Sequence, residues 1–197
     1  MGYFFSLDEI CKKNDFVLVD TCSFTEPLTN FSPEEKLEKA IISNINIPFW
    51  LERIPSYRKI YSTNGAVEEI RKWKFKYNKI IKKPIFKNGN IENIPDSRRE
   101  FRDNKKYRMN LANVLELEGR IFNMDENQKE IYNLFYEKYS FFKERFDLSE
   151  VDFDLFILGG AISRKRNTSI ISNDFGIRDA WRFFLRQEIP PGAMCKS

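Results

Sequence analysis

The stretch FVLVDTC, residues 16–22, decides the fold class of this 197-residue chain. Its first four residues are apolar and β-prone, as expected for a short central strand that is covered on both faces. An acid, Asp20, follows the strand directly. Because a buried carboxylate is costly to desolvate, Asp20 is expected either to cap the turn after the strand or to face a cation.

The same order of apolar residues and an acid recurs in TSIISND, residues 168–174. We expect a second strand at 168–172, followed by Asp174, and a third strand at 59–62. Helical patterns separate these strands, which predicts a parallel sheet in an α/β fold. Sites in such sheets form beyond the carboxyl ends of the strands, where Asp20 and Asp174 lie. A role as a turn residue is the alternative for Asp174.

Capping signals and hydrophobic periodicity predict the helices. A capping box runs from Ser32 to Glu35 and has proline at the first helical position. Helices are expected over residues 33–45, 66–80, 97–121, 126–146 and 176–187, with a further helix that begins after Ser149. Residues 82–95 contain two prolines and a glycine and predict an irregular connection. We expect a single domain, 1–197, with a basic helical elaboration at about 71–148.

The helix expected at 66–80 separates two neighbouring glutamates. Successive residues of an α-helix are about 100° apart, so Glu69 lies beside Ala66 and Trp73 on the apolar stripe. Glu68 points to the far side of the same helix. Glu69 is therefore the better candidate for a site, while a solvated boundary position is the simpler explanation of one glutamate alone.

Acids recur beside apolar segments in a chain that contains no histidine. The recurring acids are Asp20, Glu69, Asp152, Asp154 and Asp174. Oxygen ligands without histidine or cysteine suit Mg²⁺ or Mn²⁺. Such ions activate water and stabilise the leaving oxygen in phosphodiester cleavage. The set of acids therefore predicts a divalent metal site.

Two of these acids lie at the start of the helix that Ser149 opens. Asp152 could simply complete a capping box with Ser149, which is the simpler explanation of that residue alone. Asp154 stands before the apolar run LFILGGA. Because residues two apart do not share a helix face, only one of the two acids is expected in the site, and we prefer Asp152.

The order of the motifs resembles that of the PIN domain family, metal-dependent nucleases that mostly cut RNA. The motifs are FVLVDTCSF, a strand leading to AVEEI, LSEVDFDLF and SIISNDFGI, within residues 15–23, 59–70 and 148–179. The resemblance implies a three-layer fold with a central, mostly parallel sheet. In this chain an enlarged helical insertion would separate the second and third acidic motifs.

The resemblance also implies the residues of the site. The catalytic, metal-binding quartet would be Asp20, Glu69, Asp152 and Asp174, supported by the hydroxyls of Thr21 and Ser172. Asp154 is the alternate for the third acid, and Asp179 is an alternate additional ligand one turn past Asp174. Residues 71–148 are longer than the family's usual connection, so both a toxin and a processing nuclease stay open as the role.

The net charge of +4 is unevenly distributed. Residues 71–108 hold fourteen Lys or Arg against four acids, a net charge of +10, which leaves −6 for the rest of the chain. This separation predicts a polyanionic partner, although lysines on a helix face are often only solvated. The candidate nucleic-acid contacts are Lys72, Lys74, Lys76, Lys79, Lys82, Lys83, Arg98 and Arg99.

The remaining composition bears on compartment and partners. Three cysteines without disulfide or zinc spacing favour a reducing cytoplasm, and no apolar run approaches the roughly 20 residues of a membrane span. The expected partner is RNA before DNA, with an inhibitory protein partner and a homodimer left open. A non-catalytic RNA-binding or protein-interaction domain is the main alternative. A phosphatase ranks third, because an Asp-x-Asp after the first strand and a Gly-rich phosphate loop are both missing.

Overall fold

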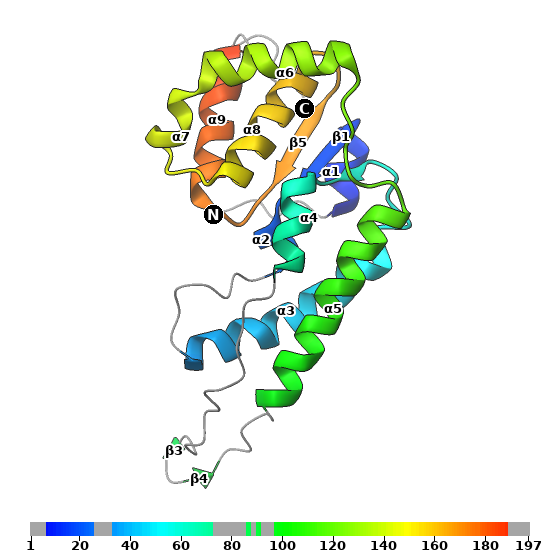
Figure 1. The fold of residues 1–197 in the computed structure, drawn as a ribbon, viewed down its shortest axis with the longest axis vertical. Helices are drawn as coiled ribbons and strands as arrows, with labels where there is room; N and C mark the ends of the chain where they lie inside the picture. The colour runs from blue at the N-terminus through cyan, green and yellow to red at the C-terminus, as the bar shows by residue number, and fades with distance from the viewer. Residues whose placement is uncertain (1–6, 26–32, 73–85, 88–89, 92–96, 189–197) are drawn as a thin grey trace.

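A computed structural model describes residues 7–25, 33–72, 86–87, 90–91 and 97–188 (Figure 1). The strands are β1 (Phe16–Val19), β2 (Ile60–Tyr61), β3 (Phe86–Lys87), β4 (Asn90–Ile91) and β5 (Thr168–Ile171). The helices are α1 (Leu7–Lys13), α2 (Thr21–Phe24), α3 (Pro33–Arg53), α4 (Asn64–Arg71), α5 (Ser97–Leu117), α6 (Glu126–Tyr139), α7 (Phe141–Arg145), α8 (Glu150–Ser163) and α9 (Phe175–Glu188). No helix among the described residues is long and apolar enough to cross a membrane.

A three-stranded parallel sheet in the order β2, β1, β5 forms the centre of the fold. All four residues of β1 are buried, as the apolar run predicted. The register pairs Val17 with Ile60 and Val19 with Ile171, so the carboxyl ends of β1 and β5 lie side by side. The mixed α/β class with a parallel sheet is thereby confirmed.

Alternate side chains of β1 enter two separate cores, as the pleat of a strand requires. Phe16 and Leu18 pack with residues of α6, α7, α8 and α9. Val17 and Val19 pack with residues of α1, α3, α4 and α5. Helices therefore cover both faces of the sheet, which explains why β1 carries no polar side chain before Asp20.

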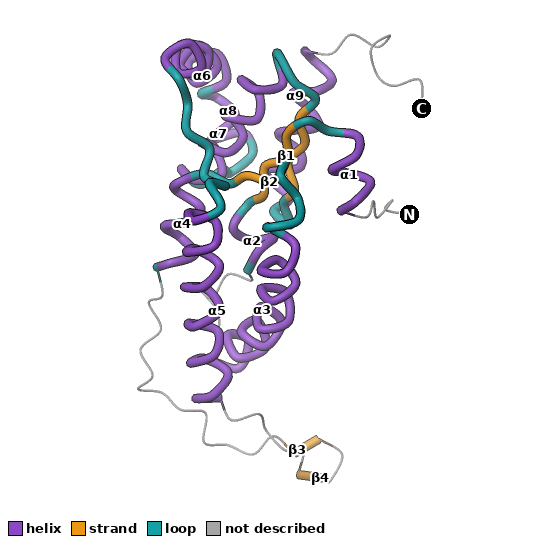
Figure 2. Tube along the Cα trace, turned by 90° about the vertical axis from the view of Figure 1, so that its right-hand side faces the viewer, coloured by secondary structure: helices purple, strands orange, loops and turns teal. Residues whose placement is uncertain are grey.

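Helices α3 and α5 lie side by side and extend away from the sheet (Figures 1 and 2). A buried polar seam joins them, centred on Asn104, whose side chain is fully buried. Its Nδ2 donates to the Ala40 carbonyl at 3.2 Å and to Asn44 Oδ1 at 2.9 Å. Its Oδ1 accepts from Arg108 Nε at 2.9 Å. These directional bonds fix how the two helices are aligned.

Two predicted helix ends were wrong. The first helix continues past residue 45 to Arg53 and contains Pro48 inside it. A proline in a helix interior costs about 3 kcal/mol, which the burial of Ile47 and Trp50 and the bond from Trp50 Nε1 to the Ser23 carbonyl offset. Helix α4 ends at Arg71, not at 80, where Lys72 leaves helical geometry with ψ 76°.

Other elements also differ from the expectation. The single helix predicted at 126–146 is divided at Ser140 into α6 and α7, and this change of direction carries Phe142 into the core. The helix predicted to reach residue 121 ends at Leu117. Short helices α1 and α2 were not predicted. Strands β3 and β4 pair within the connection that was expected to be irregular.

Replacement of Asn104 by Ala tests the polar seam. The change leaves Arg108 Nε and Asn44 Oδ1 without their present partner, and the expected loss is about 2–3 kcal/mol in the free energy of unfolding. Urea denaturation monitored by circular dichroism measures it. Asn110→Ala, on the exposed side of the same helix, is the matched control, and an equal loss in both variants would contradict the structural role of the seam.

Candidate metal site

The ends of β1 and β5 bring Asp20 and Asp174 to the same edge of the sheet. The amide of Asp20 donates to the Ile171 carbonyl at 3.0 Å, which continues the ladder one residue past β1. Ser172 connects the two acids: its hydroxyl donates to Asp20 Oδ2 at 2.8 Å and accepts from the Asp174 amide at 2.9 Å. The sequence placed Ser172 beside the acids, and the structure shows the bonds that hold it there.

Asp20 is an acid buried almost completely, with 2% of its surface exposed. The pKa of its carboxyl is raised to about 6, mainly by burial and to a smaller extent by the negative charge of Asp152. Hydrogen bonds from Cys22 and Ser172 act in the opposite direction, since they favour the carboxylate. No cationic side chain is among the main causes of this shift, and none of the described residues forms an ion pair with Asp20. Among the described residues, Asp20 is thus a buried acid that has no positively charged partner.

Glu69 approaches from α4, which Thr63 caps by accepting from the Ala66 amide. Burial raises the pKa of Glu69, with a further contribution from the charge of Asp152. The Thr21 hydroxyl donates to the Ala66 carbonyl of α4 at 3.4 Å and lies near enough to Glu69 to favour its carboxylate, and Lys72 adds a nearby positive charge; both lower the pKa of Glu69. Thr21 follows Asp20 directly, so the chain just after β1 supplies both an acid and a hydroxyl group that favours the charged form of Glu69.

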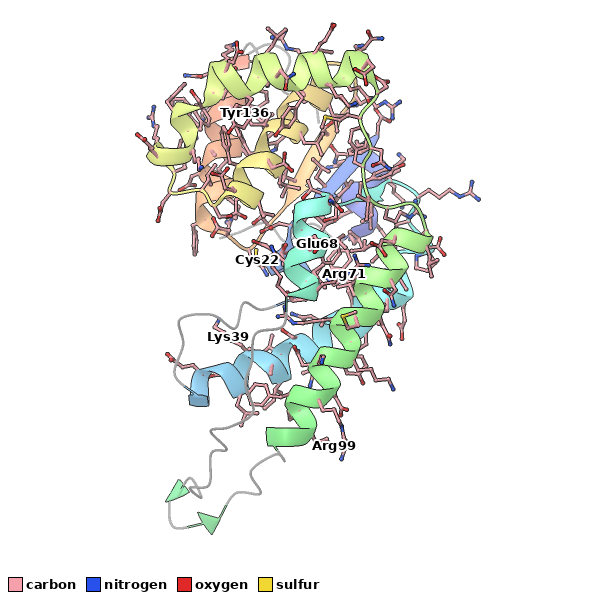
Figure 3. The ribbon with its side chains drawn as sticks, viewed as in Figure 1. Cys22, Lys39, Glu68, Arg71, Arg99 and Tyr136 are labelled. Carbon is pink, nitrogen blue, oxygen red and sulfur yellow. The ribbon has the colours of Figure 1, made fainter. Side chains whose placement is uncertain are left out.

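Glu68 takes a different direction from Glu69. Its carboxylate forms an ion pair with Arg71 at 3.3 Å on the same helix, and Figure 3 shows the two side chains on α4. The helical geometry that separated the two glutamates in the sequence therefore describes α4 correctly. Glu69, not Glu68, is electrostatically linked to Asp152.

Asp152 lies in the first turn of α8 and interacts electrostatically with both Asp20 and Glu69. The capping box is present as well: Asp152 Oδ2 accepts from the Ser149 amide at 3.3 Å, and the Asp152 amide donates to Ser149 Oγ at 3.2 Å. Asp152 can therefore cap α8 and also act through its charge on the neighbouring acids. One oxygen caps the helix while the charge acts on the other two acids.

Glycines bring α8 close to its neighbours. A Cβ on Gly65 would lie 3.3 Å from Val151, so α4 and the start of α8 are in contact. A Cβ on Gly159 would lie 2.8 Å from Ile170 of β5, and one on Gly160 would lie 2.9 Å from Phe135 of α6. This tight packing fixes the position of α8, and with it the position of Asp152.

Asp154, the alternate third acid, points away from this cluster. Its Oδ1 accepts from the Tyr132 hydroxyl at 2.5 Å, across the contact between α8 and α6. Burial raises the pKa of Asp154, and the bond from Tyr132 lowers it. Neither Asp20 nor Glu69 affects that pKa. The geometry thus favours Asp152 over Asp154 as the acid that faces the end of the sheet.

Asp174 and Asp179 lie further out. Asp174 is exposed, and its Oδ1 accepts from the Ile177 amide at 3.1 Å, so it caps α9. It is joined to Asp20 through Ser172 and has no direct effect on the pKa of Asp20 or Glu69. Asp179 pairs with Arg182 at 3.5 Å. The structure therefore brings the charge of Asp152 within electrostatic reach of Asp20 and of Glu69, and Asp174 joins Asp20 only through Ser172.

The donor set fits a hard divalent cation. Asp20, Glu69 and Asp152 supply carboxylate oxygens only, and burial, with a smaller contribution from the charge of Asp152, raises the pKa values of Asp20 and Glu69. Within the described part of the chain, no three acidic or cysteine side chains already form a complete ligand group. Capping by Asp152 and Asp174 explains part of this, because each has one oxygen on a backbone amide.

Cys22 is a member of the site that the sequence did not reveal. Its Sγ donates to Asp20 Oδ2 at 2.6 Å and lies 3.5 Å from Ser172 Oγ (Figure 3). Burial and the neighbouring Asp20 raise the pKa of the thiol to about 12, so it remains protonated and acts as a donor. The available signal was its position two residues after an acid that ends a strand.

The predicted nucleic-acid contacts are described only in part. Lys72 is exposed at the end of α4, near Glu69. Arg99 is exposed on α5 and pairs with Asp103 at 3.7 Å, and Figure 3 shows it far from Cys22. The remaining candidates lie outside the residues whose side chains are described: Lys74, Lys76, Lys79, Lys82, Lys83 and Arg98.

Comparisons with models of protein families, with characterised proteins and with solved structures find no match to this chain. The features of the site must therefore be interpreted from the geometry and the chemistry of its own residues.

The raised pKa of Asp20 predicts how stability depends on pH. Between the ordinary value of 3.8 and about 6, the folded protein binds a proton that the unfolded chain has released. The free energy of unfolding therefore falls as pH rises through this window, and the lower value persists above it. Because the amide of asparagine carries no charge, Asp20→Asn should be more stable than wild type at pH 8 without divalent ions, by about 2–3 kcal/mol.

Urea denaturation between pH 3.5 and pH 8 in EDTA measures this difference. The advantage of the variant should shrink towards the acid end of the range, where Asp20 of the wild type is protonated. Asp179→Asn, an exposed acid on α9, serves as the control and should show no such trend. A variant less stable than wild type at pH 8 would show that the charge of Asp20 is compensated within the fold.

Proposed function

We propose that this chain is a divalent-metal-dependent nuclease that hydrolyses RNA phosphodiester bonds. Asp20, Glu69, Asp152 and Asp174 would hold Mg²⁺ or Mn²⁺. The observation that carries the proposal is the burial of Asp20 beside the charge of Asp152 with no cationic partner among the described side chains. A protein tolerates such an arrangement where a bound cation compensates for it.

The residues of the chain have distinct roles in this proposal. Asp20 and Asp152 supply the inner negative charge, and Glu69 closes the set from α4. Ser172 and Cys22 orient the Asp20 carboxylate by donating to the same oxygen. Thr21 supports α4, the helix that carries Glu69, by donating to the Ala66 carbonyl at 3.4 Å. A divalent ion, when bound, lowers the pKa of a water molecule and neutralises charge that develops on the leaving oxygen.

Asp174 has the exposed position in the set, next to the surface from which a substrate would approach. Its amide and its Oδ1 are both used locally, on Ser172 Oγ and on the Ile177 amide. The acid is therefore held in place before any ligand arrives. We assign it the outer side of the ion, towards the substrate.

Exposed cations on α5 support a polyanionic substrate. Arg99, Arg102 and Lys106 recur at steps of three and four, so they share one helix face, and each is exposed. Lys105 extends the same surface. Arg99 and Arg102 share Asp103 at 3.7 Å, a distance at which a surface pair contributes little. These cations are available to phosphates, and their distance from the acids implies a substrate several nucleotides long.

An exposed aromatic ring lies next to the site. Phe175 follows Asp174 directly and is 74% exposed, and the Arg178 guanidinium lies 5.2 Å from the centre of its ring. A large apolar side chain in this position gains nothing from the core. Nucleobases stack on such rings, and arginine can contact the adjoining phosphate. We assign Phe175 to a base next to the scissile bond.

The PIN-like three-layer architecture belongs to this proposal. It is supported by parallel neighbours β1 and β5, each followed by an acid, and by helices on both faces of the sheet. A reducing cytoplasm is the compartment we propose, since Cys11 and Cys22 are free thiols. An inhibitory protein partner and a homodimer stay predictions.

A non-catalytic RNA-binding or protein-interaction domain is the second candidate. Asp152 and Asp174 each use a carboxylate oxygen to cap a helix, and the described residues contain no ready three-acid ligand group. These features suit a fold that has kept the acids for capping alone. A direct assay of cleavage decides between the two candidates.

Matched substitutions at neighbouring acids test the nuclease. Asp152→Asn keeps an oxygen for the helix cap but removes the charge that faces Asp20 and Glu69. It should lower Mn²⁺-dependent cleavage of a labelled single-stranded RNA by at least about 100-fold, since the loss of one ligand removes interactions made in the transition state. Asp154→Asn keeps an acceptor for Tyr132 and should retain activity near that of the wild type.

Equal activity in the two variants would contradict the assignment of Asp152. Absence of Mn²⁺-dependent cleavage in the wild type, with RNA binding intact, would instead favour the non-catalytic domain.

Phe175→Ala should weaken the binding of single-stranded RNA. Loss of one stacked base costs about 1–3 kcal/mol, which corresponds to a roughly 5- to 150-fold rise in Kd. Fluorescence anisotropy of a labelled oligoribonucleotide in EDTA measures binding without cleavage. Phe141→Ala, at an exposed ring on α7, is the control and should leave Kd unchanged. An unchanged Kd for Phe175→Ala would remove the ring from the substrate surface.

A further inference from the structure

A cavity of about 240 Å³ lies between α6 and α8, on a part of the molecule that the proposed nuclease does not use. Its apolar walls come from the segment before α6 and from the facing sides of both helices: Phe122, Met124, Ile131, Leu158, Ala161 and Ile162. Four of these side chains are only partly buried: Phe122, Met124, Ile131 and Ile162. The walls are thus apolar surface that the fold leaves open to a ligand.

Two cations line the cavity where α8 ends. Lys165 and Arg166 are exposed, and neither forms an ion pair within the part of the chain that the structure describes. One acid, Asp125, also lines the cavity, but its Oδ1 accepts from the Gln128 amide at 2.8 Å in the capping box of α6. The charge at the cavity is therefore net positive.

The cavity is separate from the acids at the end of the sheet. Asp152 lies in the first turn of α8, whereas Ile162 lies in its last turn. Ten residues of α-helix span about 15 Å. A ligand in the cavity would therefore not touch the Asp152 carboxylate.

We propose that this cavity binds a small amphipathic anion, with an apolar aliphatic or aromatic body and a carboxylate or phosphate head. The apolar walls would receive the body, and Lys165 and Arg166 would pair with the head. The volume of the cavity limits the size of the ligand, because it is below the roughly 300–1,000 Å³ of sites for drug-sized ligands. At about 30 Å³ for each water-sized group, it holds roughly eight such groups, the size of a short acyl chain or a single aromatic ring with a substituent.

Octanoate is a suitable probe, and 1-octanol is its neutral counterpart. The full-length protein, labelled with ¹³C at the methyl groups of Ala, Ile, Leu and Met, is titrated with each and followed by NMR. Octanoate should give saturable shifts of the Met124, Ile131, Ala161 and Ile162 methyls. Its affinity should exceed that of 1-octanol by at least tenfold. Absence of saturable shifts at these methyls would overturn the proposal.

Charge variants test the role of the two cations. Lys165→Gln combined with Arg166→Gln should weaken octanoate at least tenfold and leave 1-octanol unchanged; both positions are exposed, so the fold should be retained. Asp125→Asn keeps the helix cap and removes the opposing charge, and it should tighten octanoate. Lys106→Gln, an exposed cation on α5, is the control. Equal weakening by the control would show that binding depends only on overall charge.

Filling the cavity gives an independent test. Ala161 is 8% exposed and lines the wall, so Ala161→Leu should abolish the binding of octanoate and 1-octanol alike. Circular dichroism confirms that the variant is folded, and Ala161→Val serves if the larger residue is not accommodated. If a folded Ala161→Leu or Ala161→Val variant still binds octanoate as tightly as the wild type, the ligand lies elsewhere and the proposed site between α6 and α8 is refuted.

Discussion

The electrostatic cost of the Asp20 carboxylate is the constraint on which the proposed site depends. The chain buries this acid at the end of its central strand, where burial raises its pKa to about 6 and Asp152 adds a like charge. Two donors, Cys22 and Ser172, stabilise the carboxylate in part. Hydrogen bonds of this kind orient an acid, but they do not neutralise it. A cation between the acids would remove the cost, so the same feature would account both for a loss of stability and for the metal binding that we propose.

Packing far from the acids holds them together. Both faces of β1 are covered by helices, so the strand cannot shift without disturbing two cores. Gly159 allows α8 to lie close against Ile170, and this contact carries Asp152 to the end of the sheet. The α3 and α5 pair has its own polar seam and extends a basic surface away from the acids. The site is therefore built on the rigid elements of the fold, and the surface that we assign to the substrate is built mainly on one long helix.

Local patterns in the sequence predicted the features that depend on a few neighbouring residues. The apolar run before Asp20 indicated the buried strand, and helical geometry separated Glu69 from Glu68. Features that depend on tertiary contacts were not predictable in this way. The sequence already favoured Asp152 over Asp154, but it could not show the contact of Asp154 with Tyr132 on another helix, 22 residues away in the chain. The same holds for the proline inside α3, because the helix that contains it is held by the bond from Trp50 to the distant Ser23 carbonyl.

The most direct test of the site is the anomalous diffraction of a crystal grown with Mn²⁺. A cation that compensates the buried acid must lie within ligand distance of it, and oxygen ligands lie about 2.0–2.6 Å from hard divalent ions. We predict an anomalous peak bounded by the carboxylates of Asp20, Glu69 and Asp152, with Asp174 on its outer side. A peak without Asp20 among its ligands, or no peak at the end of the sheet at saturating Mn²⁺, would contradict the central claim.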